Sequence, residues 1–171
     1  ATAQSGINFG ANAKLLSLVL DATVDATGAG VAAGGHLELQ RISNDAGQSW
    51  LGVAASDLSL TLNIDPLSMA ISDGTLQLNQ ASAGQGKVNW SAASLTVSNV
   101  DGNTSSTADN DVNLTITSGV DLIVSGQATI EFEDLLTVEG SFALKREQLT
   151  TAQATAQSGI NFGANAKLLS L

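Results

Sequence analysis

Residues 58–64, Leu-Ser-Leu-Thr-Leu-Asn-Ile, place an apolar side chain at every second position and a small polar one between. Successive side chains of a β-strand point to opposite faces of a sheet, so this alternation gathers the apolar residues on one face. A helix needs apolar residues three and four positions apart, and no such spacing persists along the chain. The stretch therefore predicts a β-strand that is buried on one face.

The same alternation recurs along the whole chain. Glycine with Asp, Asn or Ser separates the apolar stretches, and these residues accept the backbone angles of tight turns. Asp65-Pro66 predicts a strand end or corner, and residues 44–50 suggest one short helical turn. We expect about a dozen short strands. The strand segments are 16–20, 36–40, 58–64, 75–79, 87–90, 94–98, 112–117, 121–124, 128–132, 136–139 and 142–144, and the turns are 72–74, 83–86, 101–103, 118–119, 125–126 and 139–141.

The predicted fold class is all-β, with an elongated, solenoid-like or stacked architecture built from many short strands. A β-sandwich repeat domain is the alternative. Strings of separate domains usually carry a linker rich in Pro, Gly or charge. Residues 145–158 contain neither Gly nor Pro. This favours the elongated architecture with close contact between repeats.

The first 18 residues return without a change at the end of the chain, as residues 154–171, at an offset of 153. An identity of this length predicts a longer tandem array, in which 1–153 is one full repeat unit and 154–171 is the start of the next identical repeat. The copied segment is strand-like, so we expect it at the joint between repeats. The expected repeat-interface residues are Ile7, Phe9, Leu15, Leu16, Leu18, Ile160, Phe162, Leu168, Leu169 and Leu171.

Composition narrows the range of partners. Six basic and 16 acidic residues give a net charge of -10, which disfavours nucleic acid and anionic membranes as partners. The chain has no cysteine, so disulfides cannot stabilise it. No apolar run is long enough for a transmembrane helix, so no membrane insertion is expected in this segment. Aromatic residues are only 4% of the chain, which weakens the case for a glycan-stacking groove.

Three segments resemble the repeat units of giant, highly repetitive bacterial cell-surface proteins of the adhesin-like kind. They are residues 87–97 (KVNWSAASLTV), 119–126 (GVDLIVSG) and 136–145 (LTVEGSFALK), within a resemblance that spans about residues 50–147. The resemblance implies a β-rich unit, an extracellular location on a bacterial cell surface, and a role in adhesion or surface architecture. It carries no catalytic residues to this chain.

One loop is a candidate metal site. Asp101, Asn103, Asp109 and Asp111 offer carboxylate and amide oxygens within a short glycine-containing segment. Calcium takes six to eight oxygen ligands on a flexible loop, which makes this loop a weak calcium candidate. Its spacing does not match an EF-hand. A solvated loop with Asx turns is the favoured interpretation.

The remaining candidate residues favour structural roles. Glu131 and Glu133 share a strand face, where like charges more often protect an edge than catalyse hydrolysis. His36 is the only histidine, and no serine lies in a nucleophile-elbow sequence. Trp50 and Trp90 are expected in the core with their indole N–H groups bonded. We therefore expect no enzyme activity.

The sequence predicts a structural repeat of a long extracellular bacterial surface protein. Such a repeat forms a stalk, filament or surface-layer scaffold through β packing against neighbouring copies of itself. The alternative is an adhesin module that binds a glycan or another host or cell-surface ligand with calcium support. No nucleic acid is expected among the partners.

Overall fold

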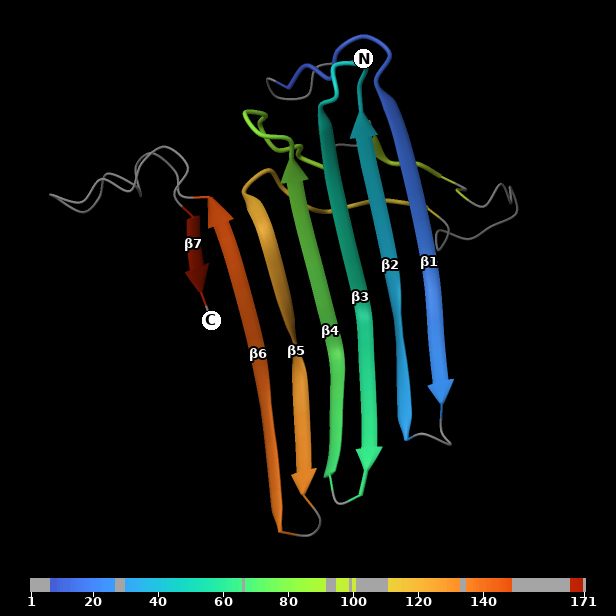
Figure 1. Cartoon of the computed structure of the whole chain (residues 1–171), viewed down its shortest axis with the longest axis vertical. Helices are drawn as coiled ribbons and strands as arrows, with labels where there is room; N and C mark the ends of the chain where they lie inside the picture. Colours follow the sequence, from blue (N-terminus) through green and yellow to red (C-terminus); the bar gives the residue numbers. More distant parts are fainter. Residues whose placement is uncertain are drawn as a thin grey trace, which may run out of the picture.

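The described residues of the chain form one open antiparallel sheet of seven strands in sequence order, β1-β2-β3-β4-β5-β6-β7 (Figure 1). This computed structural model describes residues 7–26, 30–65, 67–91, 95–98, 100, 111–132, 135–148 and 167–170. The predicted all-β class is confirmed. The strands are β1 (Lys14–Ala26), β2 (Val31–Ser43), β3 (Ser49–Ile64), β4 (Leu67–Ala81), β5 (Val120–Phe132), β6 (Leu136–Gln148) and β7 (Lys167–Ser170).

The strands are fewer and longer than predicted. Residues 125–126 and 139–141, predicted as turns, lie inside β5 and β6. Residues 72–74 lie inside β4, where the pairing with β5 shifts between Ser72 and Thr75. Neighbouring strands, on both sides of β4 and β5 and on one side of residues 139–141, supply backbone hydrogen bonds, and these hold a glycine in extended form that an isolated segment would use for a turn. The corner at Asp65 is confirmed, because β3 ends at Ile64 and β4 begins at Leu67.

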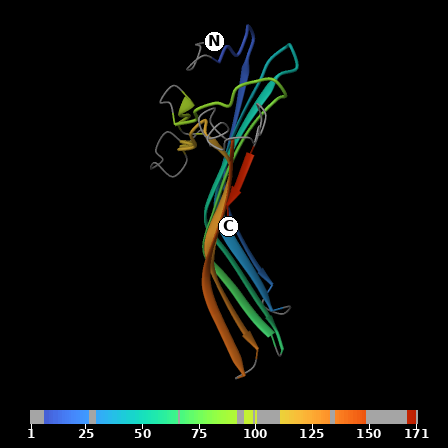
Figure 2. The ribbon, with the colours of Figure 1, turned by 90° about the vertical axis from the view of Figure 1, so that its left-hand side faces the viewer.

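Irregular pairing in the middle of β2, β3 and β4 occurs at one level of the sheet. The register shifts between Gly34 and His36 and again on both sides of Leu58. A Cβ added to Gly74 would lie 2.7 Å from the Leu58 Cβ, so only glycine fits opposite Leu58. Bulged strands bend and twist more strongly than regular ones. The edge-on view shows the resulting long, curved single layer (Figure 2).

The connection between β4 and β5 forms the core instead of adding strands. Segments 87–90, 94–98 and 112–117 were predicted as strands, but their described residues contribute only an isolated bridge between Val97 and Val112. The described part of the connection lies on one side of the sheet near one end (Figure 2). Its alternating apolar side chains are buried against the sheet, because an extended segment crossing a sheet also presents every second residue to it. The core consists of Phe9, Ile42, Trp50, Val88, Trp90, Val112, Leu114, Ile116 and Val120.

The predicted helical turn over residues 44–50 is wrong. These residues form the β2–β3 hairpin, in which the Asn44 side chain accepts from the Gln48 backbone N–H at 3.0 Å. Gly47 follows with a φ of 76°. Asn at the start of a turn and glycine at a positive φ are typical of a hairpin loop.

The other side of the sheet, which we call the open face, is apolar across β1 to β6. Its residues alternate along each strand with those that face the core. No second layer of described residues covers it, and most of its side chains are at least partly exposed, with Ala55 buried. Paired residues form continuous rows across the sheet: Leu18-Leu39-Val53-Leu78-Leu122, Leu20-Leu37-Ala55-Leu76-Val124-Leu144 and Ala26-Val31-Leu62-Met69-Ile130-Val138.

Candidate functional site: the β6 edge and the repeated segment

The described part of the repeated segment lies beside the end of β6. β7 is the second copy of Lys14–Ser17, the first four residues of β1. It pairs antiparallel with the end of β6, with Lys145 opposite Ser170 and Gln148 opposite Lys167. β1 and β7 therefore hold the same sequence at opposite edges of the sheet (Figure 1).

The predicted repeat-interface residues fall into two groups. Leu15, Leu16 and Leu18 lie in β1, and Leu168 and Leu169 lie in β7. All five are more than 40% exposed, as expected for strands at sheet edges. Their positions bring the two copies of the segment to the two places where another strand can be added.

Ile7 and Phe9 contact the hydrophobic core described above. The Phe9 ring meets Trp50 edge-on, with ring centroids 5.1 Å apart and an angle of 87° between the planes. Ile7 packs against the same core. Ile160, Phe162 and Leu171 lie outside the described residues.

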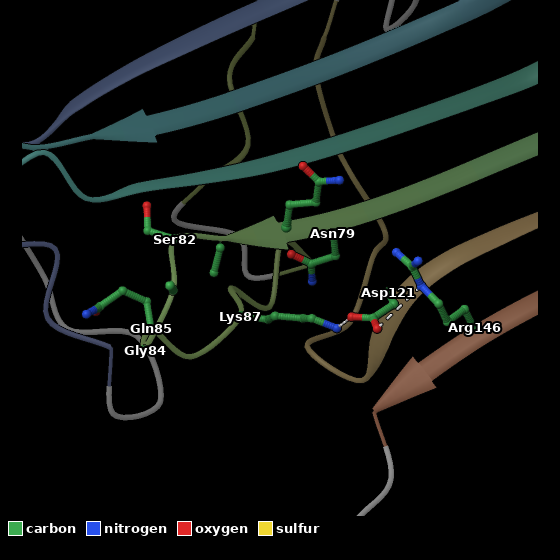
Figure 3. A pocket seen from close by; sticks show the side chains of 10 residues that line it. Asn79, Ser82, Gly84, Gln85, Lys87, Asp121 and Arg146 are labelled. Atoms are coloured by element: carbon green, nitrogen blue, oxygen red, sulfur yellow. Dashed lines mark ion pairs between the residues drawn. The ribbon is translucent and has the colours of Figure 1, made fainter. Parts of the chain in front are cut away.

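A buried carboxylate ties the β4–β5 connection to the strands beside this edge (Figure 3). Asp121, at the start of β5, is 2% exposed and forms an ion pair with Lys87 of the connection. The Arg146 Nε of β6 lies 3.7 Å from the second Asp121 oxygen. Lys87 also donates to the Val120 carbonyl at 3.1 Å. Two cations around one carboxylate satisfy the main requirement for burying a charge.

An open pocket of about 460 Å³ adjoins this ion cluster. Its wall continues from Asn79 through the turn at Gly84 to Lys87. Because Arg146 lies opposite Leu169 of β7, the cluster stands at the same level as the repeated segment. This arrangement fixes the end of β6 where the extra strand pairs.

Asn79 fastens the connection to the sheet through three hydrogen bonds. It is 1% exposed, and its amide donates to the carbonyls of Val88 at 2.8 Å and Thr117 at 3.0 Å. The Trp90 indole N–H donates to its oxygen at 3.0 Å. A buried amide with this many partners holds one packing arrangement. Trp50 likewise donates to the Gly86 carbonyl at 3.0 Å, so the prediction of core tryptophans with bonded N–H groups is confirmed.

His36 bridges two carboxylates on the sheet face that carries the core. Its Nδ1 lies 2.7 Å from Asp21 of β1, and its Nε2 lies 3.3 Å from Glu38. The hydrogen bond to Asp21, helped by Glu38, raises the pKa of the imidazole above 6.5 although partial burial opposes this. Glu38 also accepts from the Asn113 backbone N–H at 3.1 Å. His36 thus links Asp21 of β1 to Glu38 of β2, and Glu38 in turn contacts the connection.

The calcium candidate falls mostly outside the described part of the chain. Asp101, Asn103 and Asp109 are not described, and Asp111 is. Within the described residues, no three His, Asp or Glu side chains gather in a group that could hold a metal ion. Glu131, the described member of the predicted acidic pair, accepts from the Ser68 hydroxyl at 3.3 Å.

Comparison of the chain with protein-family models, with curated proteins and with solved structures finds no match. Among the described residues there is also no helix long and apolar enough to cross a membrane.

Proposed function

We propose that this chain is a structural repeat of a long extracellular bacterial surface protein, and that its copies join into one continuous β scaffold. The pairing of β7 with β6 carries the proposal. Since β7 has the sequence of the start of β1, it stands where the first strand of a following copy would stand. The surface location rests on the resemblance to repetitive adhesin-like proteins.

A scaffold of this kind works through length. Each copy contributes the six strands β1 to β6 before the next β1 begins. Neighbouring strands lie about 4.8 Å apart, so one repeat lengthens the sheet by roughly 29 Å. The net charge of -10 keeps separate arrays apart.

Chains of two, four and eight repeats test the scaffold. Electron microscopy of the purified chains is expected to show rods that lengthen by about 29 Å per repeat. Antibody raised against the repeat is expected to label intact producing cells as strongly as permeabilised ones. Rods that do not lengthen with repeat number, or labelling only after permeabilisation, contradict the proposal.

An exposed tryptophan, or calcium bound at residues 101–111, would favour the adhesin alternative. Both tryptophans are buried, and Asp111 is the described residue of that loop, so no observation on the described part of the chain favours this alternative.

A further inference from the structure

We propose that β6 of one copy pairs with β1 of the next copy along the full length of both strands, in one register. This inference rests on the proposed function and names its partner surface. It starts from the four observed pairs between β6 and β7. Replacing each β7 residue by its counterpart 153 positions earlier places Lys145 opposite Ser17 and Gln148 opposite Lys14.

Extending this register without a bulge joins the two strands end to end. Leu136, the first residue of β6, comes to lie opposite Ala26, the last residue of β1. Both strands have 13 residues, so neither overhangs the other. The register observed over four pairs at one end of β6 thus makes the far ends of the two strands coincide as well.

The faces of the two strands also match in this register. Partners in an antiparallel pair point to the same face. On the open face, four apolar pairs form, Leu136–Ala26, Val138–Val24, Phe142–Leu20 and Leu144–Leu18, and Arg146 lies opposite Leu16 near the end of the pairing. The opposite face brings together mainly polar residues, as in Thr137–Asp25, Glu139–Thr23 and Lys145–Ser17. A slip of one residue in either direction at this junction of β6 with the next β1, which we call the seam, would place Val138 opposite Asp25 or Thr23.

Exposure at the two edges fits the same partner. Val24 and Leu136 are 59% and 57% exposed in this chain, and Leu20 and Phe142 are 47% and 40% exposed. Natural edge strands usually avoid a long, flat, apolar edge, because another strand adds to it readily. Here both edge strands are 13 residues long and carry an apolar row on the open face, and pairing between copies joins one edge to the other.

The register further predicts how successive copies are offset. The open-face row that runs from Leu20 to Leu144 continues into Leu18 of the next copy, two residues earlier on β1. The row from Ala26 to Val138 continues into Val24, with the same shift. Each copy is therefore displaced along the strands by about 7 Å relative to the one before.

Engineered disulfides test the register, because the chain has no cysteine of its own. The test protein is a two-copy chain, residues 1–153 followed by residues 1–171, with one cysteine in the first copy and one in the second. The matched pairs are Glu139→Cys with Thr23→Cys and Thr137→Cys with Asp25→Cys. The crossed pairs exchange the partners, giving Glu139→Cys with Asp25→Cys and Thr137→Cys with Thr23→Cys. Each substitution thus occurs in both sets, so its effect on folding cancels.

Both matched pairs are expected to form an intramolecular disulfide under mild oxidation at least tenfold faster than the crossed pairs. Directly opposite residues have Cβ atoms about 5 Å apart, whereas diagonal neighbours are about 7 Å apart, beyond the separation that a disulfide spans without backbone movement. The proposed register between β6 and the next β1 is contradicted if crossed pairs react as fast as matched ones, or if none of the four chains forms a disulfide. The rod lengths described above report on the scaffold separately. If the rods lengthen with repeat number but the matched pairs do not cross-link, the scaffold proposal stands and only the proposed register is wrong.

Discussion

At the scale of single residues, the buried Asn79 side chain makes three hydrogen bonds that join the β4–β5 connection to the sheet. Replacing Asn79 with Leu leaves the Val88 carbonyl and the Trp90 indole N–H without their Asn79 partner in a buried site, while the Thr117 carbonyl still accepts from the Val120 backbone N–H. Each unpaired buried group costs about 1–3 kcal/mol, so we expect the free energy of unfolding to fall by roughly 2 kcal/mol or more. Urea unfolding measures this. The control, Asn63→Ala at an exposed position of β3, is expected to change stability by no more than about 0.5 kcal/mol.

His36 makes stability depend on pH. The pKa of the folded-state imidazole is raised above 6.5, so the folded protein binds the proton more tightly than the unfolded chain does. The stabilisation is complete below pH 6.5 and is lost as the pH rises through the folded-state pKa. We expect urea midpoints between pH 6 and 9 to fall with rising pH.

The variant His36→Gln provides the control for this pH dependence. It retains hydrogen-bonding groups but has no proton to lose, so its urea midpoint is expected to change less over the same range. If the urea midpoints of the two proteins fall equally with pH, His36 is not the source of the pH dependence. The neighbouring Asp21 is 70% exposed, so the whole effect is expected to be about 0.5 kcal/mol.

The roles of single residues could be predicted from the sequence where composition alone decides them. Two tryptophans in an aromatic-poor chain belong in the core, and they are there. Asn79 and Lys87 were missed, because their partners Thr117 and Asp121 lie more than 30 residues away along the chain. Asn79 stands in an ordinary alternating stretch, where it looks like one more polar residue.

At the scale of strands, Gly74 tests the bulged level of the sheet. A Cβ at this position would meet the Leu58 Cβ at 2.7 Å and the Leu58 carbonyl oxygen at 2.8 Å. Since backbone must move to admit it, we expect Gly74→Ala to lower the free energy of unfolding by about 1–3 kcal/mol. Gly140→Ala is the matched control, because no atom lies within 4 Å of its added Cβ. Equal destabilisation by both variants would contradict the close approach at Leu58.

Strand positions were predictable from period-two alternation, and strand lengths were not. Glycine with a polar neighbour is typical of a turn and equally typical of a bulge within a strand. The sequence around residues 72–74 does not state whether a partner strand is present to hold the chain extended. The alternation of apolar and polar residues at 112–117 is ambiguous in the same way. It predicts an extended segment with one side against an apolar surface, and both a strand within the sheet and a segment that crosses the sheet fit that pattern.

At the scale of the whole molecule, the chain is a meander whose two edges hold the same sequence. The copied ends alone predicted that residues 154–171 lie at a joint. Which strand they would join depends on the order of all the strands, since β6 becomes the edge only once β1 to β6 have paired in sequence. No local pattern contains that order. The register at the joint likewise comes from the observed pairs.

The seam predicts that a single charge has different effects in one copy and in two. Val138 is 49% exposed in this chain, so Val138→Lys is expected to cost at most about 1 kcal/mol here. In the two-copy chain, the same change in the first copy places an ammonium group opposite Val24 of the second copy. Calorimetry is expected to show a loss about 1–2 kcal/mol larger than in the single copy, because the lysine must be desolvated against an apolar partner. Adding Val24→Glu in the second copy is expected to recover part of that loss, since opposite charges that face each other across two strands attract. Equal losses in one and two copies, or no recovery with the glutamate, would mean that Val138 and Val24 do not meet.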